Sequence, residues 1–112
     1  MLVTKTLEAA YDVLQTVEGQ PVIGAARAKP LMKGDHMSMV KVRLDGGASA
    51  PPHKHSYETL CYVLRGKAKV TVGHETFDVD EGDAFRQPKG EVHSIYASQG
   101  VTILEVNTGS WP

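Results

Sequence analysis

The sequence predicts an all-β fold, either a sandwich or a barrel, and three observations support this prediction. Segments rich in β-branched and aromatic residues recur at close spacing through most of the chain. Glycine and proline turns separate these segments, with 11 glycines and 6 prolines among 112 residues. Several segments alternate polar and apolar residues, which places one face of a strand in a core. A double-sheet jelly roll is one architecture that meets all three requirements.

The N-terminal segment carries the only helical pattern in the sequence. Its apolar residues follow the spacing of one helix face: Leu7, Ala10, Tyr11 and Leu14. Thr6 is a suitable N-terminal cap, and Gly19 is a suitable stop. We therefore expect a short helix over residues 6 to 18, in an N-terminal extension of about 20 residues that precedes the barrel core.

Strands and turns are expected from about residue 21 to residue 107. Residues 37 to 44 form a strand pattern with Val40, Val42 and Leu44 on one face. The further expected strands cover residues 60–66, 67–72 and 75–80, a short strand before Pro88, a strand within EVHSIYA, and residues 101–107. Gly73 and His74 suit a two-residue hairpin turn with glycine first.

Length and composition indicate one ordinary globular domain spanning residues 1 to 112. The formal net charge is -1, from 12 basic and 13 acidic residues, so we expect neither nucleic acid nor an anionic membrane as a partner. Cys61 is the single cysteine, which excludes an intrachain disulfide. The sequence shows no signal-peptide pattern and no long apolar span, and we expect a cytoplasmic protein.

A pair of histidines is the first candidate for chemistry. His53 and His55 are one residue apart, and on a regular strand residues i and i+2 point to the same side. His93 is the natural third member, at the start of a later strand. Three imidazoles suit a transition metal such as iron, nickel, copper, zinc or cobalt. The pair alone is weak evidence for a metal, because histidines are also common at surfaces and in hydrogen-bonded polar cores.

Two glycine-spaced blocks surround these histidines. The first is GGASAPPHKHSYETLCYVLRG, residues 46 to 66, and the second is GDAFRQPKGEVH, residues 82 to 93. Their glycines, proline and histidines are spaced as in the two signature motifs of the cupin superfamily, which the chain resembles from about residue 37 to residue 106. The resemblance implies a small jelly-roll barrel, also called a double-stranded β-helix. It also implies that His53, His55 and His93 bind one divalent metal (Fe, Ni, Zn, Cu, Co or Mn) inside it.

The glutamate that usually completes the first cupin motif is displaced in this sequence. The family position lies seven residues before the closing glycine, and here that residue is Thr59. Strand alternation from His55 also puts Thr59 on the inner face and Glu58 on the outer face. We therefore expect a three-histidine site, with Thr59 near it in place of a carboxylate. A one-residue bulge is the arrangement that would turn Glu58 inward instead.

Four more side chains are candidates for a substrate pocket. Tyr57 and Cys61 face the cavity if the alternation holds, although a buried cysteine most often acts as a small apolar residue. Arg86 and Gln87 are consecutive on one strand, so one of them faces inward.

Without a clear general base, the resemblance favours a metal-dependent dioxygenase that acts on a small organic substrate. A metal-dependent isomerase or lyase, and a non-catalytic module that binds a carbohydrate or small acid, are the alternatives. Because exposed sheet edges need cover, and because soluble oligomers are most often symmetric dimers, we expect a homodimer.

Overall fold

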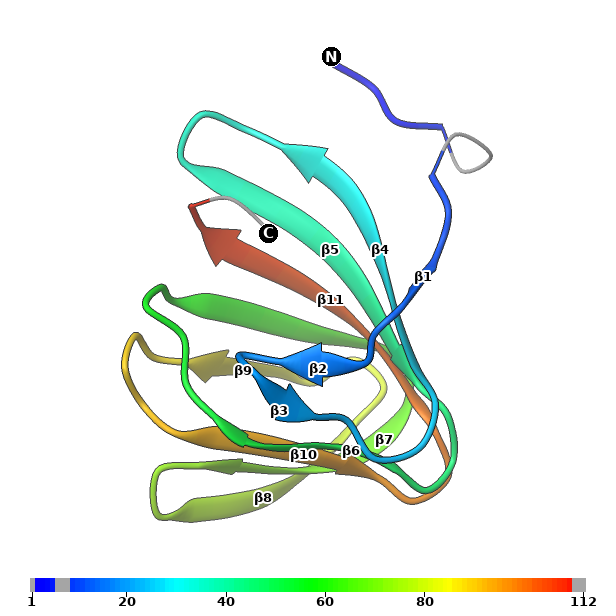
Figure 1. Cartoon of the computed structure of the whole chain (residues 1–112), viewed down its shortest axis with the longest axis vertical. Coiled ribbons are helices and arrows are strands. Elements are labelled where there is room, and N and C mark those ends of the chain that lie inside the picture. Colours follow the sequence, from blue (N-terminus) through cyan, green and yellow to red (C-terminus); the bar gives the residue numbers. More distant parts are fainter. Residues whose placement is uncertain (1, 6–8, 110–112) are drawn as a thin grey trace.

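The computed structural model describes residues 2–5 and 9–109, and Figure 1 shows them as an all-β molecule. The strands are β1 (Asp12–Val13), β2 (Thr16–Val17), β3 (Gln20–Pro21), β4 (Ala26–Lys33), β5 (Met37–Leu44), β6 (Ala48–His53), β7 (Thr59–Val72), β8 (Glu75–Asp80), β9 (Ala84–Gln87), β10 (His93–Ala97) and β11 (Val101–Thr108). The strands expected from the second half of the sequence are confirmed, with residues 60–66 and 67–72 joined in the single long strand β7.

Nine of these strands form one curled antiparallel sheet in the described part of the chain. Seven follow one another in the order β1-β4-β5-β11-β7-β10-β6, and β8 and β9 each pair with β7 outside this order. Strand β7 is the link between its two halves. The N-terminal half of β7 pairs with β9 and β11, and its C-terminal half pairs with β8 and β10. The sheet therefore curls around an interior, as Figure 1 shows, and forms the half-barrel of a jelly roll.

Gly66 lies at the change of partners in β7. Its φ is +81°, and a Cβ at this position would overlap the carbonyl oxygen of Gly100. A positive φ is readily adopted only by glycine. The register between β7 and β11 shifts at the same place, next to Thr102. Gly66 therefore lets β7 bend where it passes from one half of the sheet to the other.

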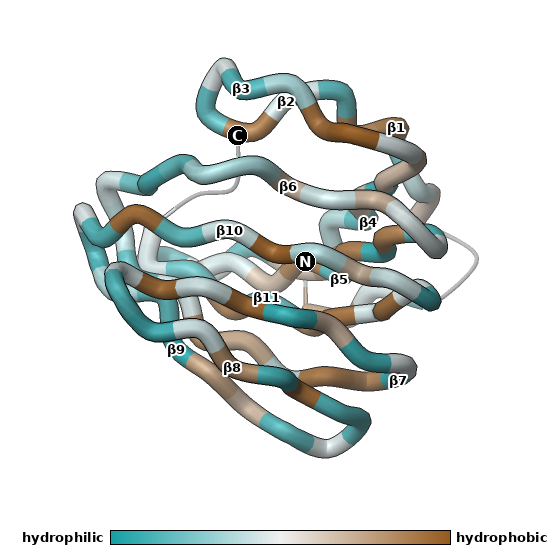
Figure 2. The backbone as a smooth tube through the Cα atoms, turned by 90° about the horizontal axis from the view of Figure 1, so that it is seen from below, coloured by the Kyte–Doolittle hydropathy of each residue, from teal (hydrophilic) through white to brown (hydrophobic). Residues whose placement is uncertain are grey.

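The core lies inside this curl and consists mainly of small and β-branched side chains. It includes Ala26, Ala28, Val40, Val42, Leu44, Ala48, Ala50, Cys61, Val63, Ala68, Val70, Val79, Phe85, Ile95, Ala97, Val101 and Ile103. The predicted inward face of Val40, Val42 and Leu44 is confirmed, since all three side chains are buried. Figure 2 shows how hydrophobic and hydrophilic positions alternate along the strands.

The expected helix over residues 6 to 18 is wrong for the portion that the structure describes, residues 9 to 18. This portion forms β1 and β2, while residues 6 to 8 lie outside the described part. Asp12 and Val13 pair with β4, and Leu14 donates a backbone hydrogen bond to Ala26. An isolated helix of this length is marginal in water, and pairing with an existing sheet edge satisfies the same backbone groups.

The segment from β2 to β3 folds into a hairpin that covers one side of the interior. Ile23 pairs with Ser49 of β6, and Leu14, Val17 and Val22 pack against the core. In Figure 2 this hairpin lies beyond β6, at an edge of the curled sheet. In the residues described, there is no helix long and apolar enough to cross a membrane.

Candidate metal centre

His53, His55 and His93 converge at one end of the curled sheet. His53 ends β6, His55 lies in the loop that follows, and His93 begins β10, directly opposite His53 in the sheet register. The ring centroids are 4.9 Å apart for His53 and His55, 4.3 Å for His53 and His93, and 5.0 Å for His55 and His93. One ring nitrogen of each residue lies within 4.8 Å of the other two. The three imidazoles brought together by the sequence prediction are therefore adjacent in space.

The histidine pair reaches this arrangement by a route that differs from the expected one. Strand β6 ends at His53, and residues 54 to 58 are irregular, so His53 and His55 are not neighbours on a regular strand. The backbone carbonyl of His55 instead accepts a hydrogen bond from the amide of Gly90. This bond ties the loop of the first motif to the Pro-Lys-Gly turn of the second. The turn thereby helps to hold His55 near the beginning of β10.

Each imidazole uses its Nδ1 atom for a hydrogen bond within the protein. Nδ1 of His53 lies 2.7 Å from the carbonyl oxygen of Pro51, and Nδ1 of His93 lies 3.1 Å from that of Glu91. A carbonyl oxygen only accepts, so both Nδ1 atoms carry protons, and both Nε2 atoms keep a free lone pair. Nδ1 of His55 lies 2.8 Å from Oε1 of Glu18, a partner with the same effect.

The Nε2 atom of His93 is buried and lacks a hydrogen-bond partner. A buried lone pair without a donor is costly, and a metal ion is one group that would satisfy it. Ligating histidines typically donate their second ring nitrogen to a carbonyl or a carboxylate, as all three do here. The residues present therefore fit a metal ion, and neutral imidazoles select transition metals over magnesium or calcium.

Burial keeps two of these imidazoles in the neutral form that binds metal. It lowers the pKa of His53, partly opposed by the hydrogen bond to the Pro51 carbonyl. Burial, reinforced by the nearby His53, lowers the pKa of His93 to about 4. At neutral pH, both rings are therefore uncharged and need not lose a proton before coordination.

Thr59 and Glu58 lie on opposite sides of the sheet. Thr59 is fully buried and its hydroxyl donates a hydrogen bond of 2.7 Å to Oδ1 of Asn107. The Glu58 carboxylate lies 3.5 Å from the guanidinium of Arg86, and both side chains are solvent-accessible. Among the described residues, the group of ligand atoms close enough to share an ion contains histidines only.

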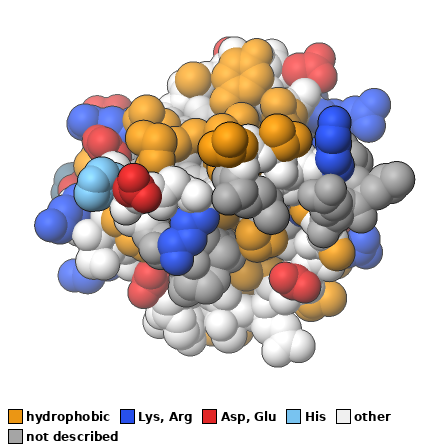
Figure 3. All heavy atoms as spheres, turned by 90° about the horizontal axis from the view of Figure 1, so that it is seen from above, with side chains coloured by type: hydrophobic (Ala, Val, Ile, Leu, Met, Phe, Trp, Pro, Cys, Tyr) orange, Lys and Arg blue, Asp and Glu red, His pale blue; other side chains and the backbone are white. Residues whose placement is uncertain are grey.

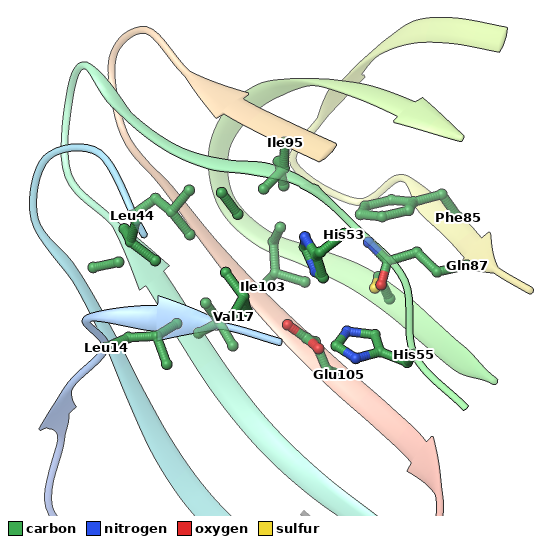
Figure 4. A pocket seen from close by; sticks show the side chains of 15 residues that line it. Leu14, Val17, Leu44, His53, His55, Phe85, Gln87, Ile95, Ile103 and Glu105 are labelled. Atoms are coloured by element: carbon green, nitrogen blue, oxygen red, sulfur yellow. The ribbon is translucent and has the colours of Figure 1, made fainter. Parts of the chain in front are cut away.

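An apolar pocket adjoins the histidines and extends toward the N-terminal hairpin (Figure 4). Its lining comprises Leu14, Val17, Val22, Ala26, Val42, Leu44, Ala50, His53, His55, Cys61, Phe85, Gln87, Ile95, Ile103 and Glu105. Of the four pocket candidates from the sequence, Cys61 and Gln87 line this pocket, and burial raises the pKa of the Cys61 thiol. Arg86 points outward beside Glu58.

Tyr57 covers one side of the centre without lining the pocket. Its ring stacks on that of His55, with centroids 4.6 Å apart and planes inclined by 14°. Burial, reinforced by the charges of Glu105 and Glu18, raises the pKa of Tyr57 to about 12. The phenol therefore stays protonated at neutral pH.

Glu105 is a candidate residue that the sequence analysis missed. It lies on β11 between the buried residues Ile103 and Asn107, opposite Cys61 of β7. Figure 4 shows its carboxyl group among the side chains that line the pocket, with the His55 ring drawn beside it. Burial raises the pKa of this carboxyl to about 7. The alternation of residues in VTILEVN indicates that Glu105 faces inward, because it places Glu105 on the same face as three buried residues.

The curled sheet and its histidine cluster define a small β-barrel protein with a candidate metal centre, the architecture of the cupins. A family model described as a cupin domain matches residues 40–106. The chain belongs to this family.

Three similar proteins illustrate the range of the family. The pectin degradation protein KdgF of Dickeya dadantii is 29% identical over 79 residues, which are 70% of this chain and 72% of that protein. An RmlC-like cupin from Shewanella frigidimarina has a TM-score of 0.83 at 19% identity, over 98% of this chain and 92% of its own. The polyketide cyclase RemF from Streptomyces resistomycificus has a TM-score of 0.82 at 21% identity, over 100% of this chain and 82% of its own. These two structural likenesses concern the fold.

Proposed function

We propose that the protein is a metal-dependent enzyme that isomerises a small oxygen-rich substrate or eliminates a group from it. His53, His55 and His93 would hold one divalent transition metal. The observation that carries this proposal is the placement of Glu105, whose carboxyl group lines the same pocket as two of the histidines. A carboxyl group beside a metal centre can act as the general acid or base that proton transfer to or from a substrate requires.

A bound metal would supply Lewis acidity toward a carbonyl or hydroxyl oxygen of the substrate. The protein's own groups have separate tasks. Three imidazoles add no negative charge to the centre, and Glu105 can give or accept a proton near neutral pH because its pKa is about 7. The amide of Gln87 offers a donor and an acceptor for orientation of a polar substrate. The apolar wall, which includes Phe85 and Ile95, limits access of water.

The comparisons support this class of substrate. The names of two similar proteins refer to pectin degradation and to polyketide cyclisation. Pectins and polyketides are both rich in carbonyl or hydroxyl oxygen, and such groups are good partners for a Lewis-acidic metal.

The test is turnover in the absence of oxygen. Metal-loaded protein is incubated under nitrogen with a panel of small keto acids, hydroxy acids and uronates, and products are followed by nuclear magnetic resonance. We expect conversion of at least one substrate, reduced on the order of 100-fold or more in Glu105→Gln at unchanged metal content. No conversion under nitrogen, or equal rates for the variant and the wild type, would contradict the proposal.

A dioxygenase remains the second candidate. The observation in its favour is the ligand group itself, which contains three imidazoles and, among the described residues, no carboxylate. The expectation from the sequence also assumed a cavity without an acid group, and Glu105 removes that premise. Oxygen uptake by the iron(II) form with β-diketones, thiols or phenolic acids would favour the dioxygenase. Tight binding of a small molecule without turnover in either assay would favour a binding module.

A further inference from the structure

The turn between β2 and β3, in the N-terminal part of the chain, contacts the histidine cluster. Glu18 and Gly19 form this turn, and Oε1 of Glu18 lies 2.8 Å from Nδ1 of His55. The other two histidines use backbone carbonyls of residues two positions away. His55 therefore differs from them, because a side chain 37 residues distant in the sequence holds its ring.

The backbone at Glu18 is in an unfavourable conformation for its residue type. Its φ is +49°. Among the residues that the structure describes, every other residue with a positive φ is a glycine. Glycine, asparagine or aspartate would suit such a hairpin turn better than glutamate. Residues in this region persist where surrounding structure holds them, often at functional sites. The turn itself gives no reason for a glutamate, whereas the contact with His55 requires a long side chain that ends in an acceptor.

The hairpin is anchored firmly enough to position this carboxylate. Ile23 exchanges backbone hydrogen bonds with Ser49 of β6, the strand that ends in His53. Val17, directly before Glu18, packs against the core, and Val22, directly after β3, does the same. The hairpin is thus fixed to the strand that carries one ligand, while its turn contacts another.

We propose that Glu18 is a positioning residue, which holds the His55 ring with Nδ1 protonated and with Nε2 directed toward a metal ion. This inference rests on the metal site of the proposed function. A carboxylate that accepts from a ligating histidine fixes its tautomer and orientation and raises its basicity. The N-terminal hairpin, which is outside the cupin match at residues 40–106, would then contribute to metal affinity.

Two substitutions distinguish the effect of the Glu18 carboxylate from the effect of its backbone conformation. Glu18→Gly removes the side chain and relieves the backbone, so a purely structural residue would tolerate it or gain stability. Glu18→Gln keeps the length and an acceptor but loses the charge. Glu81→Gln is the matched control, since Glu81 is an exposed residue of another turn. The affinity of each protein for Co²⁺ or Zn²⁺ is measured by competition with a chelator.

We expect the affinity to fall by about 10- to 100-fold in Glu18→Gly, by a smaller factor in Glu18→Gln, and not at all in Glu81→Gln. The ¹⁵N resonances of the His55 ring in metal-free protein give a second measurement. The wild type should show Nδ1 protonated, and Glu18→Gly should show a mixture of tautomers.

Equal metal affinity in the wild type and Glu18→Gly would overturn the inference and leave the proposed function intact. Failure of the wild type to bind any metal would overturn the proposed function instead. The ring resonances would then decide the positioning role alone: a change in Glu18→Gly would support it, and unchanged resonances would overturn it.

Discussion

Glu105 lies on the inward face of β11, where burial raises the pKa of its carboxyl to about 7. Glu58, by contrast, lies on the outside of the molecule beside Arg86. The two glutamates therefore have different chemical capacities, although neither belongs to the histidine cluster. A carboxyl group with a pKa near 7 can both give and accept a proton at neutral pH, and Glu105 is such a group.

The pH dependence of stability tests the environment of Glu105. Its pKa in the folded protein lies above the ordinary value of 4.5. The folded state therefore holds this proton more tightly than the unfolded state does. The resulting contribution to the free energy of unfolding is fully present below pH 4.5 and is lost as the pH rises through 7. In metal-free protein, Glu105→Gln should exceed the wild type by roughly 1 to 3 kcal/mol at pH 8 and match it near pH 4. Urea unfolding at both pH values measures this, and parallel stability curves would argue against a buried carboxyl.

The pair Thr59 and Asn107 tests which side of β7 faces inward. Thr59→Val keeps the shape but leaves Oδ1 of Asn107 without its donor, at a cost of about 1 to 3 kcal/mol. Glu58→Gln breaks only an exposed ion pair and should change stability by about 0.5 kcal/mol or less. Urea unfolding of the two variants gives both values. A larger loss in Glu58→Gln than in Thr59→Val would contradict the orientation.

At the scale of elements, the bend in β7 depends on one glycine. Gly66→Ala would force a Cβ against the carbonyl of Gly100 at a positive φ, and we expect a loss of about 3 kcal/mol or more. Gly82→Ala is the control, because its φ is +92° but no atom lies within 4 Å of the added Cβ. That variant should lose only about 1 kcal/mol. Thermal unfolding compares the two, and equal losses would show that the close approach at Gly66 is unimportant.

Elements with local signals could be predicted from the sequence, and those that depend on distant partners could not. Strands β5 and β8 show alternation, and the Gly73-His74 turn has its own signature. Strand β4 shows neither, because Pro30 and a register shift interrupt it. The N-terminal hairpin has the sequence pattern of a helix, because the apolar spacing that packs Leu14 against the barrel also fits a helix face.

The same distinction applies to the site. The glycine spacing around His53, His55 and His93 is recorded in the sequence, and it predicted their proximity. The contacts of Glu18 and Glu105 depend on how the hairpin and β11 meet the cluster, and neither lies in a motif. Only the inward register of β11 offered a sequence signal for Glu105, and nothing local offered one for Glu18.

At the scale of the whole molecule, the outer face of β5, β11 and β7 carries an apolar patch. Met39, Leu60, Tyr62 and Leu64 are exposed there, and β11 adds Leu104 and Val106 between them in the register. Figure 3 shows the molecule from above, where hydrophobic side chains lie among charged ones at the surface. A contiguous patch from three adjacent strands is larger than scattered apolar residues and typically marks an interface.

We propose that a second copy of the chain covers this face. A net charge of -1 opposes self-association only weakly, and a twofold axis would place the same patch on both subunits. Light scattering coupled to size exclusion should give a dimer, and Leu60→Glu should give a folded monomer. A wild type that stays monomeric at all concentrations, or a Leu60→Glu variant that remains dimeric, would contradict the proposal.

The metal content of the protein tests the central claim of the account most directly. The protein is purified without a nickel column, loaded with a mixture of divalent transition metals, desalted and examined by elemental analysis. We expect about one metal ion per chain, lost in His53→Ala and His93→Ala and retained in His74→Ala, which changes an exposed histidine of the β7–β8 turn. Wild-type protein that retains no metal, or a His93→Ala variant that retains as much as the wild type, would contradict the three-histidine centre.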